Sequence, residues 1–424
     1  MKEFNRNRLC GRASARFPCV LAGVGIAIAT TTVTAVAQDA EGDVISLTAG
    51  LAVTRDSNVL RVPDGTNTSQ YGGTGLSDTI LRGSLGIAFD RLISQQRLQM
   101  SANVEGYKYK DFDSFDNVGY DAGLNYDWVI GRPFFGRLGG RVYKFQPAIQ
   151  DRGFGQANVD RNEVERQTIY LNGGIRFTPS WSAIAGFDLD RRRNTSALYE
   201  DSDSDYGTVE GGVRFAPGTG TEIDFVYRNT SGDYQNLQIN GPDGLPLLTG
   251  PRSNDFKQNA LLARVSYRPS EDSLLAGRIG YTKRTYDVDG TRDFSGITTG
   301  FDIQWAQSGA VKMLVSIARD IQPEDSAITP TYVDAKSIAL RPTIQATGKI
   351  RLMPFYQYID LDYKGEGGLN DRTDTFQAYG VGVNYEIRRN LNAVLDLRQE
   401  KRTSNRAGLD FDASIVTLGL QVRF

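Results

Sequence analysis

The sequence has no histidine, and its only two cysteines, Cys10 and Cys19, lie in the first 19 residues. The lack of histidine excludes most zinc sites, haem ligands and Ser–His or Cys–His catalytic pairs. Beyond residue 37 no apolar run approaches the roughly 20 residues of a membrane helix, and mean hydropathy is −0.37. We therefore expect neither a helical membrane bundle nor an enzyme, and we predict no catalytic residue, no cofactor and no metal site.

The first 37 residues have the pattern of a secretory signal peptide. Five basic residues precede a stretch of apolar and small residues, which ends in Ala35-Val36-Ala37, an A-x-A cleavage pattern. A membrane anchor is the alternative, but this stretch is rich in Ala, Gly and Thr. We predict a signal peptide over 1–37 and one domain over 38–424, exported through the periplasm.

The charge balance argues against nucleic acid as a partner. The chain has 48 basic and 50 acidic residues, and without residues 1–37 the counts are 43 and 49, a net charge of −6. A nucleic-acid-binding surface needs an excess of positive charge, which this composition does not provide.

Period-two alternation runs through the rest of the chain. In the last segment, Val416, Leu418, Leu420, Val422 and Phe424 share one face, and polar residues or glycine share the other. This period is that of a β-strand with one apolar and one polar side. We predict about 18 such strands, near 44–55, 78–90, 97–109, 118–129, 134–145, 166–177, 181–192, 205–215, 221–230, 256–268, 273–285, 294–306, 310–320, 331–346, 349–363, 373–388, 391–401 and 410–424.

The connections between these strands alternate between short turns and longer loops, such as 56–77, 146–165 and 231–255. This alternation is typical of outer-membrane barrels, which have short periplasmic turns and long extracellular loops. We therefore predict an all-β fold, a transmembrane antiparallel up-and-down β-barrel of about 18 strands, with 16 as the alternative. Loops 56–77 and 231–255 either fold inward as a constriction or stay outside.

Aromatic residues recur at one end of the predicted strands. Eight of the nine strands that run toward the short turns end their apolar face in an aromatic residue, which indicates a girdle at a membrane interface. The predicted girdle consists of Phe89, Trp128, Phe177, Phe215, Tyr267, Trp305, Tyr385 and Phe424.

The face opposite the apolar one carries charges of both signs on nearly every strand, so we expect it to line a water-filled lumen. Its charges either form ion pairs that stiffen the wall or provide a polar track for a charged or hydroxyl-rich solute. The predicted lumen-lining residues are Arg82, Glu105, Tyr107, Asp121, Arg137, Arg141, Tyr143, Arg176, Asp188, Glu210, Arg214, Asp224, Arg228, Arg264, Arg278, Asp302, Arg341, Asp396 and Arg398.

Several short motifs resemble a known family. They are Arg55-Asp56-Ser57-Asn58-Val59-Leu60-Arg61, Ser77-Asp78-Thr79-Ile80, the turn at 91–98, and the Tyr107-x-Tyr109 end of the third strand. The sequence here, most densely over 44–180, resembles the EpsL-type exosortase-associated exopolysaccharide barrels, within a broader group of β-barrel porins. The resemblance implies a role in passing a secreted polysaccharide across the outer membrane, and it supplies no residue-level transport site.

The expected function is that of a passive conduit in the bacterial outer membrane, with an exopolysaccharide as the cargo. A general diffusion porin for small solutes is the first alternative, and a structural or adhesive barrel with an occluded lumen is the second. Expected partners are outer-membrane lipid, the barrel assembly machinery, polysaccharide or small solutes in the lumen, and periplasmic polysaccharide-export proteins.

Overall fold

The structure is a computed structural model that describes residues 44–69, 75–147, 161–218, 220–237, 252–270, 272–287, 293–308, 310–323, 332–364 and 372–424. The predicted signal peptide over 1–37 lies outside the described residues. Within them, no helix has the length and apolar character needed to cross a membrane.

The described residues form one 18-stranded sheet with two short 3₁₀ helices beside it. The strands are β1 (Ile45–Asp56), β2 (Asp78–Ile93), β3 (Gln96–Tyr109), β4 (Asn117–Ile130), β5 (Phe134–Phe145), β6 (Val164–Arg176), β7 (Trp181–Asn194), β8 (Ser204–Phe215), β9 (Thr221–Leu237), β10 (Arg252–Ser270), β11 (Ser273–Tyr286), β12 (Phe294–Ser308), β13 (Val311–Pro323), β14 (Tyr332–Gln345), β15 (Ile350–Lys364), β16 (Thr373–Arg388), β17 (Leu391–Ser404) and β18 (Phe411–Arg423). The 3₁₀ helices are η2 (Asp113–Phe115) and η4 (Ala197–Ser202).

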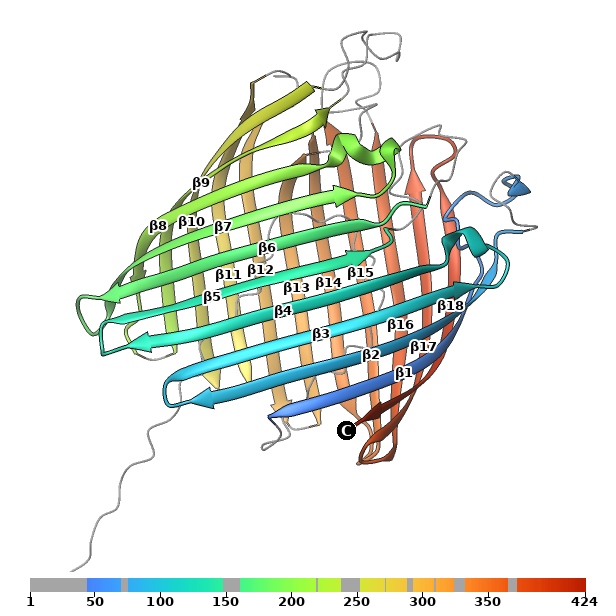
Figure 1. Ribbon diagram of the computed structural model, residues 1–424, viewed down its shortest axis with the longest axis horizontal. Helices are drawn as coiled ribbons and strands as arrows, with labels where there is room; N and C mark the ends of the chain where they lie inside the picture. Colours follow the sequence, from blue (N-terminus) through green and yellow to red (C-terminus); the bar gives the residue numbers. More distant parts are fainter. Residues whose placement is uncertain are drawn as a thin grey trace, which may run out of the picture.

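The sheet closes on itself (Figure 1). Every strand pairs antiparallel with its neighbour in the sequence, and β1 pairs with β18 from Thr48↔Arg423 to Asp56↔Ile415. Closure pairs the backbone groups that an open edge would expose to lipid. The predicted 18-stranded up-and-down barrel is confirmed.

Most strand boundaries lie within three residues of the sequence prediction, but β9 and β10 are longer. Residues 231–237 and 252–255, expected in a loop, continue the two strands, with Phe256 opposite Gly232 and Asp255 opposite Asp233. The strands extend because apolar and polar residues still alternate there, although the apolar residues now lie on the inner face. Tyr234 and Phe256 point inward and are buried, while Asp233 and Asp255 are on the outer side.

The turn between β2 and β3 is tighter than expected. Of the segment 91–98, only Ser94 and Gln95 lie outside the strands, with Ile93 paired to Gln96. Ser94 has a φ of 58°, in the left-handed region that two-residue hairpin turns require. The side chain of a non-glycine residue is strained there.

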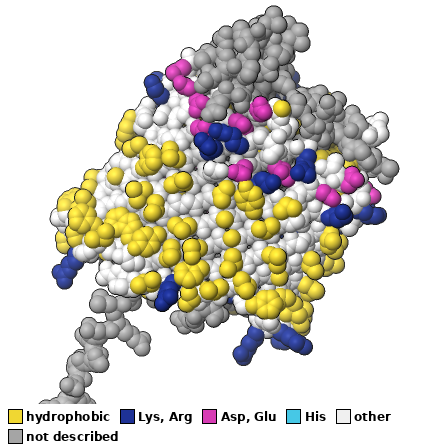
Figure 2. Space-filling view, viewed as in Figure 1, with side chains coloured by type: hydrophobic (Ala, Val, Ile, Leu, Met, Phe, Trp, Pro, Cys, Tyr) yellow, Lys and Arg dark blue, Asp and Glu magenta, His cyan; other side chains and the backbone are white. Residues whose placement is uncertain are grey.

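Hydrophobic side chains cover the outer surface of the barrel in a belt, and charged side chains gather toward its ends (Figure 2). Members of this belt are strongly exposed, among them Leu85 at 67% and Leu261 at 66%. Such a belt is the surface expected of a barrel that lies in hydrocarbon.

Candidate pore interior and mouth

The two faces of the wall can be followed from strand to strand through the pairing registers. The outer face is the one that carries the exposed aliphatic residues, such as Leu81 on β2 and Val104 on β3. The residues between them, such as Arg82 and Glu105, lie on the inner face. Because side chains alternate in a strand, this assignment carries around the whole barrel.

All 19 predicted lumen-lining residues lie on the inner face by this register. The structure brings many of them together as ion pairs. Glu210 receives Arg228 and Arg264 from two neighbouring strands, each at 2.7 Å from Oε2. That these residues line a solute path is a proposal, developed below.

Other pairs follow the same cross-strand pattern. Arg214 donates to Asp224 with Nε–Oδ1 of 2.7 Å, and Arg278 reaches Asp320 at 2.7 Å. Arg137 pairs with Asp127, and Arg141 with Asp121. Each partly exposed pair contributes only about 0–1 kcal/mol, so the network mainly cancels charge and fixes side-chain positions.

Tyrosines and amides share the inner face of β3 to β6 with these charges. The Arg141 guanidinium lies 4.8 Å from the ring centroid of Tyr143, and the Tyr170 hydroxyl donates to Asn125. Tyr107 donates to Glu105 on the same strand. This part of the wall therefore presents aromatic rings, hydroxyls and amides with internally paired charges.

The inner face of β14 to β18 departs from the expected polar pattern near the end where β1 finishes and β2 begins, which we call the mouth. A buried apolar cluster lies there, made of Val333, Ala335, Ile359, Leu361, Tyr363, Phe376, Ala378, Phe411 and Ala413. The sequence prediction missed it because it assigned apolar residues to the outer face throughout. On β15 that polarity is reversed near the mouth, where Asp360 and Asp362 lie on the outer face.

Buried charges adjoin the apolar cluster on β17, whose inner residues are Asp396, Arg398, Glu400 and Arg402. Glu400 has no exposed surface and lies 2.5 Å from an Arg398 nitrogen. Asp374 of β16, also fully buried, receives Arg402 and the Nη2 of Arg372 at 2.6 Å. Two of the predicted lumen residues, Asp396 and Arg398, thus belong to a packed region.

The segment 57–69, which follows β1 in the predicted loop 56–77, folds onto this region. This part of the loop is therefore directed inward. Arg61 bridges two strands, with Nη2 2.9 Å from Asp56 of β1 and Nε 2.9 Å from Glu400 of β17. Its guanidinium also lies 5.9 Å from the ring centroid of Phe411. Burial disfavours the charge on Arg61, but the two carboxylates outweigh it and raise its pKa above the ordinary value.

Asn58 gives this segment a second attachment. Its backbone N–H donates to Asp56 Oδ1 at 2.9 Å, a local turn typical of Asp and Asn. Its side-chain amide donates to the carbonyls of Val62 at 2.7 Å and Asp412 at 3.1 Å. The Asp56-x-Asn58 spacing is the sequence signal from which this attachment could have been inferred.

The neighbouring β3–β4 connection packs against the same segment. Leu60 is fully buried beside Phe112 and Phe115. Asp78, at the start of β2, holds the connection through its carboxylate, which accepts the N–H groups of Lys110, Asp111 and Phe112 at 3.1–3.3 Å. The motifs around Asp56 and Asp78 therefore build one side of the mouth.

The eight predicted girdle aromatics lie on the outer face or continue it by one residue, at the short-turn end. Phe177 and Phe424 immediately follow β6 and β18 and are 61% and 71% exposed. Phe215 packs against Trp181 of the preceding strand, β7, with ring centroids 4.8 Å apart. Their position at a membrane interface stays a prediction.

Comparison with sequence families matches residues 273–424, which are β11 to β18, to the family described as "Putative beta-barrel porin 2". The match covers less than half of the chain, and it shows that the part from β11 to β18 is similar to that family. The closed sheet shows that the chain is an 18-stranded antiparallel β-barrel. No curated protein sequence matches this chain.

Among solved structures, the chain is similar to OpdK (OccK1) of Pseudomonas aeruginosa, with 10% identity and a TM-score of 0.46 over 90% of this chain and 99% of that one. OpdL of the same organism has 12% identity and a TM-score of 0.42, covering 90% and 98%. The ferric enterobactin receptor PfeA of that organism has 9% identity and a TM-score of 0.42, covering 89% and 80%. At TM-scores below 0.5, these similarities carry no argument about function.

Proposed function

We propose that the barrel is a passive conduit through which a secreted polysaccharide leaves the cell. The observation that carries this proposal is the inner face of β3 to β13, where opposite charges are paired with each other. Glu210 with Arg228 and Arg264 is the clearest case. A wall of this kind offers hydrogen bonds without a strong field of one sign, which suits a hydroxyl-rich polymer better than a small ion.

The aromatic residues of this wall support the same cargo. Tyr107, Tyr143 and Tyr170 lie on the inner face of three nearby strands. A tyrosine ring has an apolar face and a polar tip, so it can stack on a sugar ring while its hydroxyl oxygen accepts a hydrogen bond from a sugar hydroxyl. The resemblance of the segment at 55–61 to exopolysaccharide barrels favours the same reading.

A general diffusion porin for small solutes is the first alternative, supported by the family match over 273–424. A structural or adhesive barrel with an occluded lumen is the second, supported by the inward attachment of residues 57–69 at the mouth. If the barrel transports either kind of cargo, its short-turn end faces the periplasm. Periplasmic polysaccharide-export proteins would dock at that end if the cargo is a polysaccharide.

Two experiments separate these functions. Purified full-length protein in a planar bilayer should give stepwise currents with weak ion selectivity, and a folded barrel without current would remove both transport proposals. A deletion strain should then lose surface polysaccharide while small-nutrient uptake stays unchanged. Slowed nutrient uptake with normal surface polysaccharide would instead identify a diffusion porin.

A further inference from the structure

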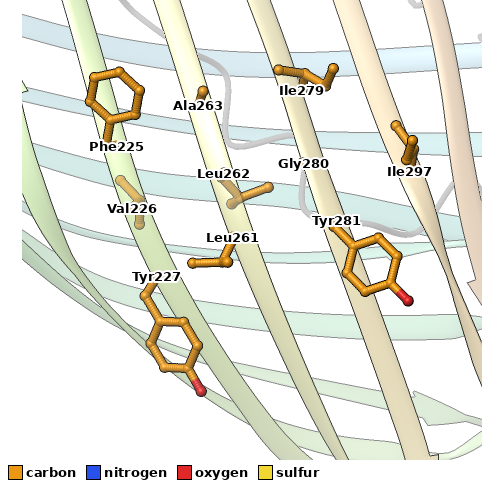
Figure 3. A pocket seen from close by; sticks show the side chains of 10 residues that line it. All are labelled: Phe225, Val226, Tyr227, Leu261, Leu262, Ala263, Ile279, Gly280, Tyr281 and Ile297. Carbon is orange, nitrogen blue, oxygen red and sulfur yellow. The ribbon is translucent and has the colours of Figure 1, made fainter.

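A shallow apolar groove of about 540 Å³ lies on the barrel wall at β9 to β12 (Figure 3). Its outer-face lining is exposed, with Phe225, Tyr227, Leu261, Ile279 and Tyr281 each more than half exposed. The groove therefore opens toward the lipid rather than toward the lumen.

The groove owes its shape to one small residue between large ones. Ala263 on β10 lies between Phe225 of β9 and Ile279 of β11, which stand opposite it in the two registers. Figure 3 shows the rings of Tyr227 and Tyr281 at the end of the groove that leads toward the mouth, with both hydroxyls pointing that way. A shallow apolar groove with hydroxyls at one end matches an acyl chain below a polar headgroup.

Two lysines stand above that end of the groove. Lys257 on β10 and Lys283 on β11 are exposed and lie on the outer face. Lys257 pairs with Thr285 and Lys283 with Asn259, so the two lysines are diagonal neighbours. Side chains in this relation are within reach of each other, and two like charges so placed repel unless an anion lies between them.

Two other outer-face cations of the barrel have carboxylate partners, unlike these lysines. Lys336 lies 3.4 Å from Asp360, and Arg319 lies 2.7 Å from Asp334. Among the described residues, neither Lys257 nor Lys283 has a carboxylate within 4 Å. Asp255, two residues before Lys257, and its cross-strand partner Asp233 lie on the same face, nearer the mouth. The pair is therefore available to an external anion.

We propose that this surface binds one phosphorylated lipid of the outer leaflet, lipid A, with an acyl chain in the groove and a phosphate between Lys257 and Lys283. Long loops mark the extracellular end of such barrels, so the lysines meet the outer leaflet, where lipopolysaccharide supplies phosphate groups. Basic residues at a membrane surface attract anionic headgroups. The proposal does not depend on what passes through the lumen.

The test is native mass spectrometry of the full-length barrel in detergent with added lipid A. The double variant Lys257→Gln/Lys283→Gln should bind lipid A at least about tenfold more weakly, and Ala263→Phe, which fills the groove, should also weaken binding. The matched control Lys336→Gln, at a lysine that is already paired, should bind as the unmodified protein does. Faster gel migration of the unheated barrel confirms that each variant is folded.

Further probes identify the chemistry of the ligand. Dephosphorylated lipid A should bind as weakly as lipid A binds the double variant, and inorganic phosphate alone should not compete. Equal binding of lipid A by the unmodified protein and the double variant would overturn the proposal. Phosphatidylglycerol binding with equal strength and the same lysine dependence would overturn the assignment to lipid A.

Discussion

The attachment of residues 57–69 to the inner wall depends on Arg61, and Arg61→Met should release it. The substitution keeps most of the side-chain volume and removes the charge. It takes away the contacts of 2.9 Å to Asp56 and Glu400, both of which are buried. The φ of 53° at position 61 is equally strained for methionine, so the change tests the charge rather than the backbone.

The structure sets the expected magnitude. Removing one partner of a buried ion pair costs roughly 3–5 kcal/mol because a buried charge loses its compensation. Glu400 keeps Arg398 at 2.5 Å, which places the cost at the lower end, about 3 kcal/mol. Since each 1.4 kcal/mol is a factor of ten, the detached population of this segment should rise roughly a hundredfold.

Hydrogen–deuterium exchange of the peptide covering 58–66 measures this population directly. The amides of Val59 and Val62, which donate to Leu76 O and Asn58 Oδ1, should exchange roughly a hundredfold faster in Arg61→Met. The control is Arg55→Met, because Arg55 is exposed and, within the part of the chain that the structure describes, its side chain bonds only the hydroxyls of Thr79 and Ser77. Unchanged exchange in Arg61→Met, or equal acceleration in both variants, would refute the role assigned to Arg61.

Three other substitutions test the wall, the mouth and a turn. Met100→Arg, on the outer face of β3, should destabilise the barrel in lipid by about 2–4 kcal/mol, measured by urea unfolding. Ser101→Arg, on the inner face, should leave urea unfolding nearly unchanged. Equal effects of the two substitutions would contradict the assignment of the faces. Asp78→Ala should free the backbone N–H groups of the β3–β4 connection, at roughly 1–3 kcal/mol each, and make it sensitive to proteolysis while the barrel stays folded. Ser94→Gly should stabilise the barrel by roughly 1 kcal/mol by relieving the positive φ, and a lower urea midpoint would argue against that strain.

The strand layout could be predicted because hydrocarbon on one side and water on the other impose a period of two on every membrane-crossing strand. The last strand was expected at 410–424 and is found at Phe411–Arg423, and β5 has the expected bounds. The register then places each charged residue, such as Arg82 or Asp302, on the inner face without further information.

The same reasoning fails where the strands rise above the hydrophobic belt. There the outer face meets water, so charged residues such as Asp360 point outward and Ile359 packs inward. Apolar and polar residues still alternate with a period of two, but the apolar residues now lie on the inner face. The sequence analysis therefore does not predict the apolar cluster of β14 to β18. The Arg61–Glu400 contact joins residues 339 positions apart, and no local pattern encodes such a pair.

The central claim is that one face of each strand meets lipid and the other meets water inside the barrel, and cysteine scanning along β18 tests it most directly. With Cys10 and Cys19 replaced, single cysteines at 417 to 421 would be labelled in intact outer membranes by a small, water-soluble maleimide. The structure predicts labelling at Thr417, Gly419 and Gln421 and protection at Leu418 and Leu420. Uniform labelling, or labelling of the leucine positions alone, would contradict it.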